Sequence, residues 1–309
     1  MEKNMTEKSY LGPLLIVIAA FLWAVDGVIR RNLYELPPIA IIFFEHLVGL
    51  LILSPFVVKY ALETRLNWRE WWLLVLVSVL SGLLGTLWFT TALLKVNFIS
   101  FSVVFLLQKL QPIFAIGTAR IFLKEKLDRR YIIWALLAIF SAYFVTFPNG
   151  IVNFATGAGT VVAALYALGA AFAWGSSTTF SKMLLGKVRP SVSTFYRFLF
   201  TVVVALPLLF IFGFKGGPLI VTPSELGLFI LIAVSTGMVA LLIYYKGLKR
   251  TPVHVSTILE LTFPFIAILI DMKLYNTVLT PTQWVAALVL VFSIYVIARL
   301  REGLSDQNT

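Results

Sequence analysis

The chain contains no cysteine and only two histidines, His46 and His254, among its 309 residues. The absence of cysteine excludes disulfides, thiolate nucleophiles and cysteine-ligated zinc. Two histidines do not favour a histidine-rich metal site, so no metal or cofactor is expected. Charged residues are also scarce: they make up 13% of the chain, against about a quarter of a soluble domain. Because 60% of the residues are hydrophobic, a soluble globule is excluded and the bilayer is the expected solvent.

Long polar linkers are missing as well, and ten apolar stretches of about membrane-spanning length follow one another. Only helices and closed barrels satisfy their own backbone in lipid. The sequence therefore predicts an all-α integral membrane protein with ten transmembrane helices and no separate soluble domain. The expected helices cover residues 11–29, 39–58, 71–91, 98–119, 131–147, 159–181, 192–212, 224–245, 253–271 and 282–299.

The lysines and arginines are distributed unevenly between the two sides of this arrangement. Eighteen lie on the side of the N-terminus and five lie in the opposite loops. Loops rich in Lys and Arg stay in the cytoplasm, so both termini are expected on the cytoplasmic side of the inner membrane. The net charge of +11 then reflects membrane topology, and nucleic acid is not an expected partner.

The second half of the sequence repeats features of the first at an offset of about 152 residues. Each half, 1–150 and 151–309, contains five spans, and this odd number makes the second half enter the membrane from the other side. Two inverted five-helix repeats are typical of secondary transporters, with a substrate site near the midplane between the halves. The residues in register are Pro38, Pro55, Pro112 and Gly85 with Pro190, Pro207, Pro264 and Gly237.

Short motifs in both halves resemble those of a known family. Phe21-Leu22-Trp23 is similar to the family's first-helix signature. Three further segments of the first half resemble the EamA-type repeat of the drug/metabolite transporter superfamily: Ala92–Lys95, Leu110–Ala115 and Leu123–Leu127. The second half has similar segments at Gly247–Lys249 and Phe263–Ala267.

Two positions depart from the pattern of the family. The second half has Thr277 where the first half has Glu125, and the first half has Glu45 and then His46 where the family commonly has an arginine. Arg197 matches that arginine in the second half. The resemblance covers essentially the whole chain and implies a ten-helix inner-membrane carrier of small metabolites. The superfamily includes carriers of amino acids, nucleosides, sugars and drugs, so the resemblance names no substrate.

Two charged residues, Lys109 and Glu260, lie near the middle of the fourth and ninth spans. Gln108 is the symmetry mate of Glu260, and both positions precede a proline that bends its helix and frees backbone carbonyls, Pro112 or Pro264. We expect this pair to bind a zwitterion, with Lys109 on its carboxylate and Glu260 on its ammonium group. The alternative is a direct ion pair that holds the two halves together.

Aromatic residues within the spans are candidates for the walls of the same site, since small-ligand sites are mostly apolar with few polar groups. Trp88, Trp174 and Tyr244 are the candidates. The competing interpretation is that such residues anchor the helices at the membrane interface.

A second group of charges lies toward the outer side. Asp26, Glu45 and His46 are expected at similar depth, where they would form a proton relay or a gate. Asp26 has the alternative of pairing with Arg30 one helical turn later. Arg197 is expected to attract an anion, to gate against Glu260 or to extend toward the surface. Glu125 is expected to form a structural or gating ion pair outside the substrate site.

The leading hypothesis is a secondary transporter of small polar or zwitterionic metabolites, amino acids first, acting as an exporter or exchanger. Alternating access would bend the protein at Gly85, Pro112, Gly237 and Pro264. The alternative is a proton-coupled exporter of lipophilic cations, against which Lys109 argues by repulsion. The sequence does not favour an enzyme, because neither histidine has a matching nucleophile, and no nucleotide-binding loop is present to use ATP. A channel is less compatible with inverted repeats and mid-span prolines.

Overall fold

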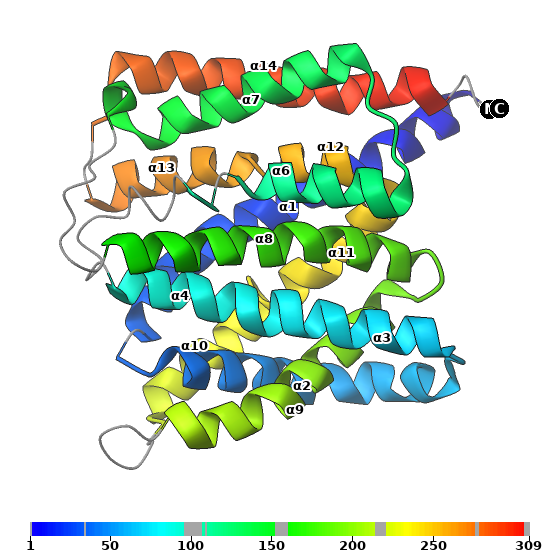
Figure 1. Ribbon diagram of the computed structural model, residues 1–309, viewed down its shortest axis with the longest axis vertical. Helices are drawn as coiled ribbons and strands as arrows, with labels where there is room; N and C mark the ends of the chain where they lie inside the picture. The colour runs from blue at the N-terminus through cyan, green and yellow to red at the C-terminus, as the bar shows by residue number, and fades with distance from the viewer. Residues whose placement is uncertain are drawn as a thin grey trace.

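The computed structural model describes residues 2–33, 35–95, 107–108, 110–151, 160–213, 221–275 and 278–305. Over these ranges the secondary structure is helical, with no strand. The helices run side by side across one bundle, and the start of α1 (Glu2–Arg30) lies at the same end as the finish of α14 (Pro281–Ser305) (Figure 1). We call this end the terminal face and the opposite end the distal face.

The first half consists of five spans, some of them divided into shorter helices. After α1 and the 3₁₀ turn η1 (Arg31–Leu33) come α2 (Pro38–Glu63), α3 (Trp68–Val77), the π-helical η2 (Ser78–Gly85) and α4 (Thr86–Lys95). The remaining elements are α6 (Gln111–Thr118), the π-helical η3 (Ala119–Leu123), α7 (Arg129–Thr146) and η4 (Pro148–Gly150).

The second half follows the same plan. Its elements are α8 (Thr160–Leu185), α9 (Pro190–Phe212), α10 (Pro223–Val234), α11 (Met238–Arg250), α12 (Val253–Leu259), α13 (Thr262–Tyr275) and α14. Nine of the ten expected spans are long and apolar enough to cross a membrane. The expected span 98–119 begins outside the described residues, and its described part is a shorter apolar helix, Gln111–Leu123.

The two halves start their third spans with the same local signal. Asn67 and Thr222 each accept a hydrogen bond from a backbone N–H at the third helical position, and the glutamate there bonds back to the capping residue. Such a capping box satisfies two otherwise unpaired donors at the helix start. The starts of α3 and α10 are therefore determined by local sequence.

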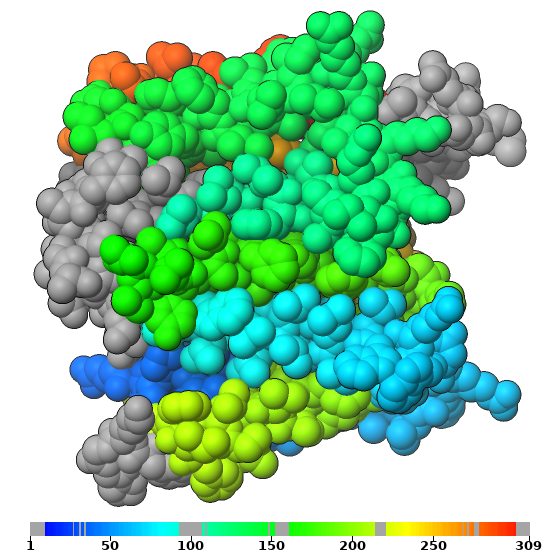
Figure 2. Space-filling view, in the orientation of Figure 1, coloured from blue at the N-terminus to red at the C-terminus, as the bar shows by residue number. Residues whose placement is uncertain are grey.

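The packing between helices repeats the symmetry of the sequence. The corresponding spans α7 and α14 pair along one edge of the bundle, and α2 and α9 pair along the other (Figure 1). The packing of α1 against α11 has its counterpart in α8 against α4, and Figure 2 views the face on which α8 lies beside α3 and α4. Both repeats thus contribute to one structure rather than to two separate domains.

Small residues allow these helices to approach closely. Ala135, Ala138 and Ala142 of α7 are buried, and a Cβ on Gly49 of α2 would lie 2.3 Å from the ring of Phe198 on α9. Small residues are enriched at helix contacts in lipid, where packing replaces the hydrophobic effect.

Four interruptions of the backbone occur at equivalent places in the two halves. Leu110 precedes α6, and Glu260 with Leu261 forms a turn between α12 and α13. The π-helical η2 ends at Gly85, and the turn Ser235–Gly237 separates α10 from α11. The four expected bending positions, Gly85, Pro112, Gly237 and Pro264, lie at or within one turn of these interruptions. Irregular backbone inside a membrane is tolerated where protein or a cavity surrounds it.

Candidate functional site

The break in the ninth span places Glu260 at the centre of a polar group. Its Oε1 accepts a hydrogen bond from the Tyr244 hydroxyl of α11 at 2.7 Å, and its Oε2 accepts one from Gln111 Nε2 of α6 at 3.2 Å. The Tyr244 and Thr178 hydroxyls lie 3.4 Å apart. Trp23 of α1 contacts Tyr244 with ring centroids 5.0 Å apart. We call Glu260, Tyr244, Gln111, Thr178 and Trp23 the central cluster.

The central cluster joins both halves at their broken helices. Gln111 begins α6 directly after the interruption at Leu110, and Glu260 lies in the interruption between α12 and α13. Their hydrogen bond therefore links the two symmetry-related breaks. Discontinuous helices of this kind form the substrate and ion sites of many secondary transporters.

Of the two cations expected near this site, one can be placed. Lys109 lies outside the described residues. Arg197 donates from NH1 to the Tyr245 hydroxyl at 3.0 Å, and its Nε has no hydrogen-bond partner in the described structure. No cation among the described residues forms an ion pair with Glu260. Gln108, the symmetry mate of Glu260, has a buried Oε1 that is likewise without a partner there.

The two expected tryptophans link the third and sixth spans, and no described contact joins either of them to Glu260. Trp174 donates from Nε1 to the Ser81 carbonyl at 3.3 Å, and a Cβ on Gly85 would lie 2.4 Å from that nitrogen. Trp88 packs on Gly169 and lines a surface pocket of about 380 Å³ between α4 and α8. Tyr244 is the member of the expected aromatic set that bonds Glu260 directly.

Charges near the distal face form a buried ion-pair group. Arg30 donates from Nε to Asp26 at 2.7 Å and from NH1 to Glu45 of α2 at 2.8 Å, and all three side chains are at most 14% exposed. The Thr236 hydroxyl, in the break between α10 and α11, donates to the other Asp26 oxygen. We call Arg30, Asp26, Glu45 and Thr236 the distal network. It ties the first, second and eighth spans together.

His46 forms no hydrogen bond or ion pair with the distal network in the described structure. Its Nδ1 lies 2.8 Å from the Ile42 carbonyl of its own helix, and its ring contacts Phe198 of α9 at a centroid distance of 4.9 Å. The structure thus brings Asp26 and Glu45 together through Arg30, while the described contacts of His46 are with its own helix and with α9.

A third group lies at the terminal face, where a short turn joins α11 to α12. Glu125 accepts hydrogen bonds from the backbone N–H groups of Val253 (2.8 Å) and His254 (3.1 Å), and also from His254 Nδ1. Burial alone would raise the pKa of Glu125, but the hydrogen bonds from His254 and Val253 outweigh burial and hold the pKa below its usual value. Glu125 therefore pairs as expected and caps the start of α12.

The end of α11 is held by a different side chain. Lys182 of α8 donates from Nζ to the carbonyls of Leu248 (2.7 Å), Lys249 (3.0 Å) and Thr251 (2.9 Å). A cation at a helix C-terminus satisfies unpaired carbonyls and interacts favourably with the helix dipole. We call Glu125, His254 and Lys182 the terminal clasp, because they hold both helix ends at this turn.

Several of these residues were not expected from the sequence. Gln111 and Thr178 are uncharged and gave no signal beyond the position of Gln111 before Pro112. In the sequence, the only signal at Arg30 is its spacing of one helical turn from Asp26, and Lys182 is one of eighteen cations on its side of the membrane. Two further observations concern the rest of the molecule.

In the described part of the chain, no cluster of three or more acidic, histidine or cysteine residues could hold a metal ion.

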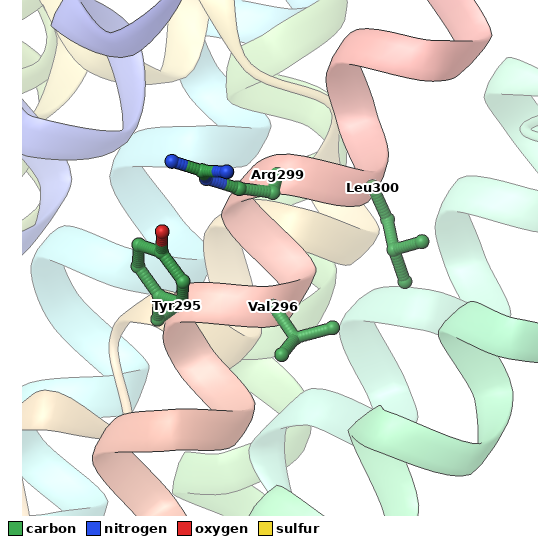
Figure 3. Close-up of a pocket in the computed structure, with 4 residues that line it drawn as sticks. All are labelled: Tyr295, Val296, Arg299 and Leu300. Atoms are coloured by element: carbon green, nitrogen blue, oxygen red, sulfur yellow. The ribbon is translucent and has the colours of Figure 1, made fainter.

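A surface pocket of about 260 Å³ lies on α14 and is lined by Tyr295, Val296, Arg299 and Leu300 (Figure 3). The Arg299 guanidinium lies 5.0 Å from the centroid of the Tyr295 ring, and both side chains extend to the same side of the helix (Figure 3). None of these residues belongs to the central cluster.

Inverted five-helix repeats with broken helices around a mid-membrane polar cluster define the class of secondary transporters. Residues 10–147 and 161–299 each match the model of the EamA-like transporter family, and the chain belongs to this family. It is a multi-pass membrane transporter and not an enzyme.

Two curated relatives and one solved structure are similar to this chain. The riboflavin transporter ImpX of Fusobacterium nucleatum subsp. nucleatum is 36% identical over 293 residues, which are 94% of this chain and 98% of the relative. The uncharacterized transporter YwfM of Bacillus subtilis is 24% identical over 94% of this chain and 95% of its own. A protein crystal structure with 17% identity shares the fold, with a TM-score of 0.75 over 95% of this chain and 98% of the other.

Proposed function

We propose that this protein carries riboflavin, or a closely related flavin, across the membrane by alternating access. The observation that carries the proposal is the 36% identity to a riboflavin transporter over nearly the full length of both chains. The similarity extends through both repeats, and therefore through every helix that contributes to the central cluster.

The chemistry of the central cluster supports a flavin. Riboflavin combines a flat heteroaromatic ring, an imide N–H and a chain of hydroxyl groups, and it is neutral. Trp23 and Tyr244 offer aromatic surfaces, while the Glu260 carboxylate and the Gln111 amide offer acceptors for N–H and O–H groups. A few polar groups on aromatic and apolar walls are the usual composition of a small-ligand site.

Amino acids, the first expectation from the sequence, are a second candidate. Glu260 has no cation partner among the described residues, and the ammonium group of an amino acid would supply one. The same carboxylate would suit a lipophilic cation. We prefer riboflavin because the relative that transports it is similar over nearly the whole chain. The expected partner of an amino-acid carboxylate, Lys109, lies outside the described residues.

Alternating access requires that the two faces open in turn. We assign the terminal face to the cytoplasm, because the loops rich in Lys and Arg lie there. The distal network closes the outer end, which favours a gating role for Asp26 and Glu45. The terminal clasp closes the inner end. The four backbone interruptions provide places where the spans bend between the two states.

Transport by purified protein in proteoliposomes tests the proposal, with riboflavin followed by its fluorescence in both the uptake and the efflux direction. Riboflavin should move faster than in empty liposomes, and an excess of amino acids or lipophilic cations should not compete with it. The variant Tyr244→Phe should slow transport, whereas Tyr295→Phe at an exposed position of α14 should not. Amino-acid transport without riboflavin transport would overturn the proposal.

A further inference from the structure

The carboxylates within this bundle differ in how their charge is compensated. Asp26 and Glu45 share Arg30, and Asp26 also receives the Thr236 hydroxyl. Glu260 receives two neutral donors, Tyr244 and Gln111. A charge near the bilayer centre costs about 2.5–3.5 kcal/mol even on insertion scales, and hydrogen bonds from neutral groups leave its net charge in place.

The surroundings of Glu260 contain few groups that could neutralise it. On α11, Tyr244 bonds it and Tyr245 follows. On α9, Arg197 is directed to the Tyr245 hydroxyl. On α1, Asp26 is held by Arg30, and at the start of α12, His254 is held by Glu125. The partners from α6 and α8, Gln111 and Thr178, do not titrate. Every described cation near the cluster therefore has another partner.

We propose that Glu260 is the proton-binding site of this transporter and that it couples substrate movement to a proton gradient. The inference moves the coupling role from Asp26 and Glu45, where the sequence favoured it, to the break in the ninth span. It goes beyond the proposed substrate, because a carboxylate at this place exchanges a proton whichever small molecule is carried.

The step involves one proton and no oxidation or reduction. In the state open to one side, a Glu260 oxygen forms an O–H bond with a proton from that aqueous phase, which leaves the side chain neutral. After the two faces exchange, the O–H bond breaks and the proton leaves to the other phase. The carboxylate is then restored and ready for the next cycle.

The hydrogen bonds of the central cluster transmit this change to other helices. A protonated Glu260 carries a donor, so the Tyr244 hydroxyl changes from donating to Glu260 to accepting from it. Tyr244 then donates to Thr178 Oγ1, which lies 3.4 Å away and can take either role. Gln111 keeps its bond to the other oxygen. One proton on the ninth span thereby alters a contact between the sixth and eighth spans.

Infrared difference spectroscopy during pH titration tests the proton site without any substrate. A protonated carboxylic acid has its own C=O stretch, and the wild-type protein should show, in addition to the bands of its other carboxyl groups, a titrating band from Glu260. Glu260→Gln should lose it, and Glu260→Asp should retain it at a shifted position. Glu63→Gln, an exposed residue at the end of α2, is the matched control and should keep the band. A wild-type protein without the band, or a band that persists in Glu260→Gln, would overturn the proposal.

Proteoliposomes with a pH gradient test the coupling. For one proton per neutral substrate, a gradient of one pH unit should give an accumulation or exclusion of about tenfold at equilibrium. Glu260→Gln should abolish this ratio, with Glu63→Gln unchanged. Riboflavin transport that ignores the gradient would refute the coupling while leaving the proposed substrate intact. If the Glu260 band titrates but the protein does not transport riboflavin, the proposed substrate is wrong and the proposed proton-binding site still stands.

Discussion

The two ends of this bundle are held together by different kinds of interaction. At the distal face, the buried Arg30 forms ion pairs with both Asp26 and Glu45. At the terminal face, Glu125 and Lys182 bond mainly to the backbone at the ends of α12 and α11. The distal face therefore depends on pairing between buried charges. The terminal face depends on hydrogen bonds to the backbone groups at helix ends.

This difference determines how much stability is lost when one side chain is removed from each end. Removing one partner from a buried ion group leaves an uncompensated charge, which is strongly destabilising. Removing a helix cap leaves unpaired backbone groups but no uncompensated charge, which costs less. The variants below use this contrast.

The largest effect is expected from Arg30→Met. Without the arginine, Asp26 and Glu45 are left buried with no cation between them, and unfolding free energy should fall by about 3–5 kcal/mol. Thermal unfolding in detergent measures the loss. The triple variant Arg30→Met, Asp26→Asn, Glu45→Gln removes the charges together and should recover most of it. A triple variant as unstable as Arg30→Met would show that packing, not charge, sets the stability of this end.

A smaller effect is expected from Lys182→Met. The variant keeps the length of the side chain but removes hydrogen bonds to three carbonyls at the end of α11. Hydrogen bonds from a charged group are worth about 1.5–3 kcal/mol, and the unfolding free energy should fall by that amount. Protease sensitivity of the turn at Thr251 should rise in parallel. Unchanged stability would mean that the lysine only covers this end of the helix.

The next effect depends on pH and comes from Glu125. The pKa of Glu125 is lower in the folded protein than in the unfolded chain. Its contribution to the free energy of unfolding is therefore complete above the usual glutamate pKa and is lost as pH falls through the lowered value. The melting temperature of the wild-type protein should therefore drop more steeply on acidification below about pH 4.5 than that of Glu125→Gln. Parallel curves for the two proteins would contradict the role of the ionised carboxylate.

The smallest effect is expected from Lys187→Met, also at the terminal face. Lys187 pairs with Glu70 at 2.8 Å, but its side chain is 67% exposed, and exposed ion pairs contribute little. The melting temperature should stay within experimental error of the wild type. A loss as large as that of Lys182→Met would mean that any terminal-face cation matters, and the distinction between helix caps and surface pairs would not hold.

The parts of this structure that the sequence predicted are those determined by local pattern. The lengths of the apolar stretches predicted nine spans within a few residues of their observed bounds. This works because a helix needs about 20 apolar residues to cross the hydrocarbon core of a bilayer. Pro112, Pro264, Gly85 and Gly237 marked the interruptions, because proline and glycine act on their own backbone. Glu260 was singled out because a mid-span charge is costly.

The contacts that the sequence did not predict join side chains of one helix to groups of another. Arg30 bonds Glu45 across a helix boundary, and Lys182 reaches carbonyls 66–69 residues away; no spacing rule encodes either contact. Gln111 is neutral, so no energetic argument drew attention to it. Trp88 and Trp174 looked alike in the sequence, but packing against Gly169 and Gly85 directs both toward neighbouring helices.

The most direct test of alternating closure uses the absence of cysteine from the chain. Spin labels on the exposed pair Lys126→Cys and Lys249→Cys report the terminal face, and labels on Asn32→Cys and Ser224→Cys report the distal face. Pulsed electron resonance should show that Arg30→Met lengthens only the distal distance and Lys182→Met only the terminal one. If either variant changed both distances, or the one at the other end, the two groups would not be separate closures of the two faces.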